Sequence, residues 1–413
     1  MEVNRSGAWA WLAHGVMAAA IGLGLWLFGL GLVFQWRRLA LELSQGLGFA
    51  DPACTTGYCD YSMFWLAGFL LRHGGGGLLY DHSAYAAAAA RVLPYASGWW
   101  PFVYPPTMLL PAVAISAMPL VAGYYGFCVL SLGVSIFLLR RAGVAWWCIG
   151  LGLAGPAAMW NLYLGQFGLL CGALLVAGLA GLETAPLRAG GVLALLCVKP
   201  QYAMLVPVAV LAGRYWRVLL AGCCGLALLL GLSWFCFGTG VWAGYLGPGR
   251  AAMTGLLTQN FGPGYQAMGI SVFWMVRSFG STLGVAAAVQ GAVSACAALA
   301  VWRLWRRPAA GRMRRVTITV FLTLLATPYG FTDDLAVYSV LLPSLARWGA
   351  PWRNAGLAGL WVAPALIPKL VGVLGFLPAP LLVMAAVALV WKSDGAPVRD
   401  TAIRVPQAAI QLQ

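Results

Sequence analysis

Apolar residues run along this chain in long blocks that are separated by short groups of arginine, proline and glycine. A helix needs about 20 mostly apolar residues to cross a bilayer, so these blocks predict a helical protein with many membrane spans. The predicted spans, about twelve in number, cover residues 12–35, 121–139, 144–160, 166–182, 189–200, 202–213, 218–237, 280–302, 314–328, 335–347, 354–373 and 376–391. Several are short, so we expect this number to hold only to within one or two.

The apolar block over residues 189–213 must be divided to give two of these spans. Lys199 and Pro200 lie near its middle. Proline cannot continue the hydrogen bonding of a helix interior. The sequence therefore predicts a break in the helix at this dipeptide.

Two segments between predicted spans, residues 37–120 and 238–279, are too long to be simple turns. Long loops often carry function. In the first segment, the run DYSMFWLAGFLLRH is apolar but only about a dozen residues long, which is typical of an interfacial or re-entrant helix. A second short helix follows, with Asp81 or Ser83 as its expected N-cap. We predict a single membrane domain over residues 1–391 and a polar, disordered tail over residues 392–413.

The composition excludes a soluble protein. The chain is 62% hydrophobic and 8% charged, whereas soluble domains carry about 25% charged residues. The net charge of +15 does not call for a nucleic-acid partner, because basic residues on cytoplasmic loops orient membrane proteins. With the N-terminus inside, most of the basic residues fall on the cytoplasmic side and both long segments fall outside.

Few residues in this chain can carry chemistry, since it has only ten carboxylates. Asp60 stands at the start of the predicted interfacial helix, where it could cap the helix or act as a base. Lys199 is costly at a break between apolar spans unless it is paired or near water. Asp333 and Asp334 are adjacent, and either could instead cap the next span. With no histidine nearby and no third acid, we expect neither a metal nor a cofactor.

Several motifs occur in the order CDYSMFWLAG, LLYD, PFVYPPT, NLYLGQFGLL, VKPQ, SVFWMVRSFG and ATPYGFTDDLAVY. Taken together, over roughly residues 10–350, they resemble glycosyltransferase family 87, the polyprenyl-phosphate-mannose-dependent mannosyltransferases of bacterial membranes. The resemblance implies a GT-C fold, with short juxtamembrane helices in the first outer loop. It also implies an active site that faces the outside of the bacterial plasma membrane.

The resemblance implies roles for individual residues. Asp60 matches the catalytic Asp of the family. Given such a donor, we expect Lys199 to hold its phosphate, and the alternative is that Lys199 only reaches the outer interface. Arg250 or Arg277 could share the phosphate or serve as an interface anchor. Contacts to the sugar or the acceptor are expected from Gln166, Gln201, Tyr329, Asp81 and Asp333. Helix–helix hydrogen bonding remains an alternative role for the two glutamines. The family also places a histidine later in the chain, but no histidine follows His82 here.

The partners implied are a polyprenyl-phosphate sugar donor, a lipid or glycan acceptor, and membrane lipids. A transporter or lipid flippase is the main alternative, and a GT-C enzyme that uses another sugar, such as arabinose, is a further one. Transporters often show internal repeats and polar residues at the membrane midplane. The sequence shows no repeat, and its acids fall near the outer rim. Cys54 and Cys59, which share the first outer loop, could form a disulfide or remain as two thiols.

Overall fold

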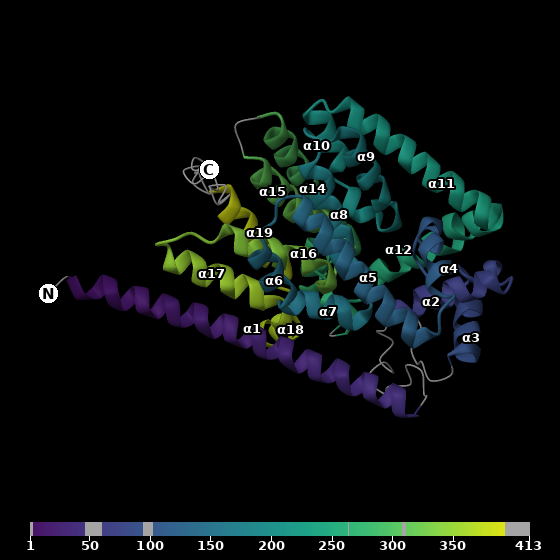
Figure 1. Ribbon diagram of the computed structural model, residues 1–413, viewed down its shortest axis with the longest axis horizontal. Helices are drawn as coiled ribbons and strands as arrows, with labels where there is room; N and C mark the ends of the chain where they lie inside the picture. Colours follow the sequence, from purple (N-terminus) through teal and green to yellow (C-terminus); the bar gives the residue numbers. More distant parts are fainter. Residues whose placement is uncertain (1–2, 46–59, 94–101, 263, 308–310, 393–413) are drawn as a thin grey trace, which may run out of the picture.

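The computed structural model describes residues 3–45, 60–93, 102–262, 264–307 and 311–392. Within these ranges the protein is helical and contains no strand, as the apolar blocks predict. The possible disulfide between Cys54 and Cys59 and the tail beyond Lys392 lie outside the described residues. Figure 1 shows α1 (Val3–Gln45) running along one edge of the molecule and the other helices gathered beside it.

The first half of the chain contains two long helices, α1 and the helix over residues 120–141, among several short ones. Besides α1, the helices are α2 (Asp60–Arg72), α3 (His82–Val92), α4 (Leu109–Ile115), α5 (Leu120–Arg141), α6 (Trp146–Leu153), α7 (Pro156–Leu164), α8 (Gly168–Ala180), α9 (Pro186–Ala194) and α10 (Val206–Ala212).

The second half contains the remaining helices, two of which are longer than 20 residues. They are α11 (Trp216–Gly244), α12 (Arg250–Thr258), α13 (Val272–Ser278), α14 (Leu283–Trp305), α15 (Arg312–Ala326), α16 (Ala336–Leu341), α17 (Pro351–Val362), α18 (Ile367–Leu374) and α19 (Ala379–Trp391).

The prediction of about twelve spans is not confirmed. Four helical stretches are long and apolar enough to cross a membrane, judged by length and composition within the described residues. The bent pairs α7–α8 and α17–α18, which turn by 118° and 88°, raise this number to six if each pair is one span. Proline stands at or next to the first residue of α7, α9, α10, α17 and α18. Because proline interrupts helical hydrogen bonding, apolar blocks that look continuous in sequence fold as separate short helices.

Helix α1 lies along α17 and α7 and exposes much of its apolar surface. A Cβ atom on Gly24 would lie 2.1 Å from the ring of Trp361 in α17, so only glycine allows this close approach. The outward side chains of Trp11, Trp26 and Trp36 are 80%, 61% and 70% exposed. Such exposure of large apolar side chains is what a helix in contact with lipid requires.

Helix α2 is the short apolar helix predicted after the first span, but it is buried inside the protein. Nine of its 13 residues are buried, and it packs on α4. A Cβ atom on Gly68 would meet the carbonyl of Ala112 at 2.1 Å, so the crossing depends on this glycine. The indole of Trp65 donates to the Met118 carbonyl at 2.9 Å. These contacts fix the N-terminus of α2, where Asp60 stands.

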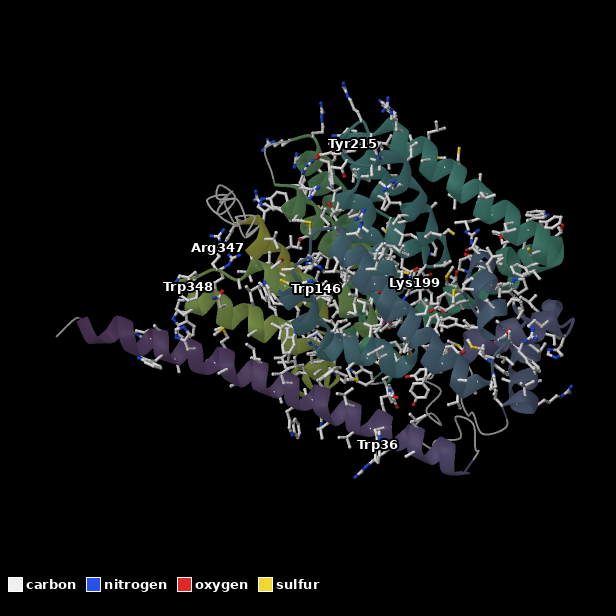
Figure 2. The ribbon with its side chains drawn as sticks, in the orientation of Figure 1. Trp36, Trp146, Lys199, Tyr215, Arg347 and Trp348 are labelled. Carbon is white, nitrogen blue, oxygen red and sulfur yellow. The ribbon has the colours of Figure 1, made fainter. Side chains whose placement is uncertain are left out.

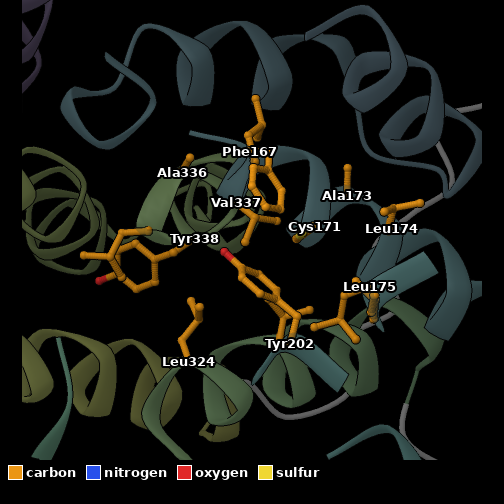
Figure 3. Close-up of a cluster of buried hydrophobic side chains, with 14 of the residues drawn as sticks. Phe167, Cys171, Ala173, Leu174, Leu175, Tyr202, Leu324, Ala336, Val337 and Tyr338 are labelled. Atoms are coloured by element: carbon orange, nitrogen blue, oxygen red, sulfur yellow. The ribbon is translucent and has the colours of Figure 1, made fainter. Parts of the chain in front are cut away.

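Two local features bring polar residues into the apolar core. The predicted break at Lys199 is confirmed, since two 3₁₀ turns, Leu195–Val198 and Pro200–Ala203, flank it. Gly165 adopts a left-handed conformation, with φ of 65°, between α7 and α8. Figure 3 shows the core beside these breaks, with the hydroxyl of Tyr202 directed toward the side of the cluster that holds Phe167, Cys171 and Val337.

Candidate active site

A cavity of about 440 Å³ lies where seven separate stretches of the chain meet. Most of its lining is apolar or aromatic, and a few charged and amide side chains face into it. The lining residues come from the start of α2, the stretch before α4, the α7–α8 bend, the break at Lys199, the π-helical turn at Tyr245–Gly249 with α12, and the loops at 265–268 and 327–333. This composition is typical of a site that takes a ligand with an apolar body and a polar group.

Asp60 is the first residue of α2 and is half-buried at the cavity wall. Its Oδ2 accepts a hydrogen bond from Nε2 of Gln166 at 2.6 Å. Burial raises the pKa of Asp60 to about 7, and the charge of Asp333 raises it further, while the Gln166 hydrogen bond and Lys199 lower it. A carboxyl group with a pKa near neutrality is suited to accept a proton during a reaction.

Gln166 owes its position to the bend between α7 and α8. Its backbone N–H donates to the Asn161 carbonyl at 2.9 Å, which closes the end of α7. The side-chain amide then reaches both Asp60 and the hydroxyl of Tyr104, which accepts from Nε2 at 3.1 Å. A Cβ atom on Gly165 would lie 2.4 Å from Cβ of Tyr61, so glycine is required for the approach to α2 as well as for the backbone conformation.

Lys199 is buried and forms an ion pair with two neighbouring carboxylates. Its Nζ lies 2.5 Å from Oδ1 of Asp334 and 3.4 Å from Oδ2 of Asp333. The same Oδ1 of Asp334 accepts from the Tyr202 hydroxyl at 2.9 Å, and Oδ2 accepts from the backbone N–H of Phe331 at 3.1 Å. The ammonium group also lies 5.5 Å from the centre of the Phe167 ring. The charge of this lysine is thus balanced within the protein.

Two loops are joined beside the cavity and carry part of its wall. The backbone N–H of Ile270 donates to the Gly330 carbonyl at 2.9 Å, and the hydroxyl of Thr332 donates to the Met268 carbonyl at 2.8 Å. The rings of Tyr265 and Phe331 lie 4.6 Å apart between their centres. These contacts hold the segment that carries Asp333 and Asp334 against the ion pair with Lys199.

Comparison with known families gives a match to the model of glycosyltransferase family 87 over residues 102–328, which is more than half of the chain. This protein belongs to glycosyltransferase family 87. It is therefore a glycosyltransferase, and its apolar helices place it in a membrane. No curated protein and no solved structure matches it. The matched segment includes Tyr104, Gln166 and Lys199 but neither Asp60 nor the adjacent pair of acids.

The glycosyltransferase brings six of the nine residues predicted for its site to one cavity. Asp60, Lys199, Gln166, Gln201, Tyr329 and Asp333 all line it. The other three, Asp81, Arg250 and Arg277, are absent from the lining. Asp81 is exposed and caps α3, where its Oδ1 accepts from the Ala84 N–H at 2.9 Å. One of the two expected N-caps is thus confirmed.

The two arginines of the second long segment do not face the cavity. Arg277 donates to the backbone carbonyls of Ser281 at 2.6 Å and Gln259 at 3.0 Å, so it holds together the ends of two short helices. Arg250 is exposed at the start of α12. Both arginines lie outside the lining, so a role beside Lys199 at the phosphate stays a prediction.

Sequence reasoning missed three residues of this site. By sequence, Tyr104 is expected to belong to an interfacial aromatic belt. In the structure, its hydroxyl instead accepts a hydrogen bond from Gln166 in the cavity wall. Tyr265 gives no sequence signal beyond its aromatic ring. The sequence position of Asp334 predicts a cap, but in the structure Asp334 is the main partner of Lys199. A count of charges indicates such a pairing, since a buried lysine needs an acid. Within the described ranges, no group of three or more His, Cys, Asp or Glu side chains could hold a metal ion.

Proposed function

We propose that this glycosyltransferase moves a hexose, mannose by resemblance, from a polyprenyl-phosphate sugar to a lipid or glycan acceptor. In this proposal the reaction takes place at the outer face of the bacterial plasma membrane, on a GT-C fold, and inverts the anomeric carbon. The observation that carries the proposal is the position of Asp60, a carboxyl group with a pKa of about 7, in one cavity with the buried Lys199.

Asp60 supplies the general base. The acceptor hydroxyl passes its proton to a carboxylate oxygen of Asp60, and the acceptor oxygen forms a bond to C1 of the donor sugar. The bond between C1 and the phosphate oxygen breaks, and its electron pair stays on the polyprenyl phosphate. A lipid phosphate is a good leaving group, so no acid partner is needed, in contrast to the two-carboxylate glycosidases. A β-linked donor gives an α-linked product through this single displacement.

The remaining lining fits the two ends of such a donor. Met63, Met204, Met253 and Leu256 offer flexible apolar contacts that suit the first units of a prenyl chain. Among the described lining residues, Lys199 is the only cation that can approach the phosphate. Gln201 and Tyr329 offer hydrogen bonds to sugar hydroxyls. The transporter alternative loses its support, because family membership assigns the chain to glycosyltransferases.

A transfer assay tests this proposal. Purified protein in liposomes receives synthetic polyprenyl-phosphate-[¹⁴C]mannose together with a membrane-lipid extract as the acceptor source, beside liposomes without protein. The expected result is a new labelled product whose mannose is removed by an α-mannosidase. Transfer from polyprenyl-phosphate-arabinose or another lipid-phosphate sugar, with none from the mannose donor, would correct the sugar. Transfer from a nucleotide sugar alone would overturn the donor class.

A further inference from the structure

Asp333 and Asp334 are adjacent in the chain but differ in their surroundings. Asp334 is 1% exposed, and its two oxygens accept from Lys199, Tyr202 and the backbone of Phe331. Asp333 meets Lys199 at the longer distance of 3.4 Å and is the member of the pair that lines the cavity. The structure thus gives Lys199 one fixed counter-ion and leaves a second carboxyl group at the cavity wall.

The charges around the cavity do not favour an anionic ligand. Three carboxyl groups, those of Asp60, Asp333 and Asp334, lie at or beside the cavity. Among the described lining residues, Lys199 is the only one with a positive charge. A polyprenyl-phosphate sugar adds the negative charge of its phosphodiester. Like charges in a poorly hydrated site repel one another strongly, and such sites respond by taking up a proton. Binding of the donor therefore has to be coupled to a gain of positive charge.

We propose that the phosphodiester donor binds with uptake of one proton by Asp333, so that the hydrogen bond from Lys199 passes from Asp333 to the phosphate. This inference rests on the proposed donor class. Asp334 keeps its three donors, and Asp60 keeps the hydrogen bond from Gln166. When Lys199 turns toward the phosphate, Asp333 loses its cation and faces two anions. Its protonated form then donates a hydrogen bond to the phosphate or to a sugar hydroxyl.

The other groups around Asp333 are consistent with this assignment. The charged groups that act on it are Asp334 on its own turn and Lys199 at the break after α9, while Asp60 lies across the cavity at the start of α2. Tyr104, Tyr202 and Tyr265 are the tyrosines near Asp333, and all three are uncharged near neutral pH. Burial, followed by the charge of Asp334, already raises the pKa of Asp333, while Lys199 lowers it. Moving Lys199 toward the phosphate therefore pushes that pKa up.

The test measures donor binding as a function of pH, with acceptor omitted. The ligand is synthetic polyprenyl-phosphate-mannose, whose phosphodiester does not titrate between pH 5 and pH 9, as a phosphomonoester would. For the wild type we expect the Kd to rise about tenfold per pH unit above the pKa of Asp333. For Asp333→Asn we expect the rise in Kd with pH to be smaller by about tenfold per pH unit, with any slope that remains belonging to Asp60. We also expect its Kd at pH 8 to be at least about tenfold lower than the wild-type value. Equal pH slopes in the two proteins would overturn the proposal.

Two controls separate this effect from others. Phosphatidylglycerol, a phosphodiester lipid without the sugar, and the uncharged polyprenol show whether the slope belongs to the site or to the membrane surface; a matching slope for either lipid overturns the proposal. Calorimetry of the wild type in two buffers of different ionisation enthalpy counts the protons taken up for each donor bound. One proton taken up by both the wild type and Asp60→Asn supports the proposal, even if Asp333→Asn does not fold. No uptake by the wild type, or uptake that disappears in Asp60→Asn, overturns it.

The outcome is distinguishable from failure of the proposed function. Transfer of mannose without a pH-dependent Kd leaves the function intact and removes the role of Asp333. Binding of the donor with uptake of one proton, but transfer only from another lipid-phosphate sugar, keeps the role of Asp333 and changes the sugar. Absence of binding by every lipid-phosphate sugar overturns both.

Discussion

Two ion pairs in this protein are built alike but lie in different places. In the cavity, Lys199 pairs with Asp334, and the Tyr202 hydroxyl donates to the same carboxylate oxygen. Near the start of α15, Arg315 lies 2.7 Å from Oε1 of Glu183, and that oxygen also accepts from a tyrosine hydroxyl, at 2.8 Å. Each cation also lies near an aromatic ring. Figure 2 labels a member of each group, Lys199 and Tyr215, and shows them well apart.

The difference lies in what surrounds each pair. The side chain of Glu183 is 43% exposed, and its pair joins the segment after α8 to the start of α15. The side chains of Lys199 and Asp334 are 5% and 1% exposed, and two further carboxylates, Asp333 and Asp60, stand nearby. The comparison teaches that an ion pair with a tyrosine is a means of joining helices at either place. The added acids and the loss of water are what make the cavity a site for chemistry.

The largest expected effect separates the two regions by activity. Asp60→Asn removes the base and is expected to lower the rate of sugar transfer about 10²- to 10⁴-fold, the usual contribution of a general base. Glu183→Gln makes the same kind of change in the other region and is expected to leave the rate within about twofold, since Glu183 lies outside the cavity lining. The measurement is initial transfer rate at saturating donor, for proteins of equal thermal stability. Equal losses in the two variants would contradict the assignment.

The next effect concerns stability. Lys199→Met leaves Asp334 buried without its cation, and we expect the free energy of unfolding to fall by about 3–5 kcal/mol, the usual result of breaking a buried pair. Arg315→Met leaves the half-exposed carboxylate of Glu183, which water can solvate. We therefore expect the loss of this ion pair to lower the free energy of unfolding by about 1 kcal/mol or less.

Chemical unfolding in a defined detergent, followed by circular dichroism, measures both losses. The double variant Lys199→Met/Asp334→Leu serves as a control and should recover much of the lost stability, because it removes both charges. A loss no greater for Lys199→Met than for Arg315→Met would show that burial does not distinguish the two pairs.

A smaller effect appears in the dependence of the rate on pH. Asp60 must lose its proton to act as a base, so its pKa of about 7 predicts that the rate rises with pH through that value. The Gln166 hydrogen bond lowers this pKa, and Gln166→Leu is therefore expected to move the midpoint upward and to slow transfer at pH 7 by a few-fold. Rate profiles of the two proteins provide the test, and a midpoint that moves downward would contradict the role of Gln166.

The smallest expected effect compares the two tyrosines. Tyr202→Phe removes a donor from a buried carboxylate, which typically costs about 1.5–3 kcal/mol for a hydrogen bond to a charged group. Tyr215→Phe removes the equivalent donor where water can replace it, so a loss below about 1 kcal/mol is expected. Thermal unfolding of both variants measures the difference, and the reverse order would disprove the comparison.

Individual residues show how far the sequence predicts this structure. The break at Lys199 follows from a proline beside a charge in an apolar block, and the capping role of Asp81 follows from local side-chain chemistry. The number of spans cannot be predicted from the sequence, because the hydropathy of an apolar block does not show the 118° bend at Gly165. The left-handed turn there depends on how closely α2 approaches, which is a tertiary contact.

The candidate site was predicted only as far as residue types allow. A carboxylate before an apolar helix and a lysine within a block are conspicuous because charges are rare in this chain. The pairing of Lys199 with Asp334 joins residues 135 positions apart, so it depends on the fold. The sequence does not predict where Arg250 and Arg277 point, because this also depends on the fold. A basic residue outside a span can either face a ligand or hold two loops together.

The central claim is that the cavity beside Asp60 and Lys199 holds a lipid-linked sugar donor. The most direct test uses a polyprenyl-phosphate-mannose that carries a photoactivatable group on its first prenyl unit, followed by mass spectrometry of the labelled peptides. The account predicts labelling of Met63, Met204 and Met253 in the cavity wall, reduced by an excess of unlabelled donor. Competed labelling at the separate apolar pocket lined by Met384 and Trp391, with none in the cavity, would contradict it.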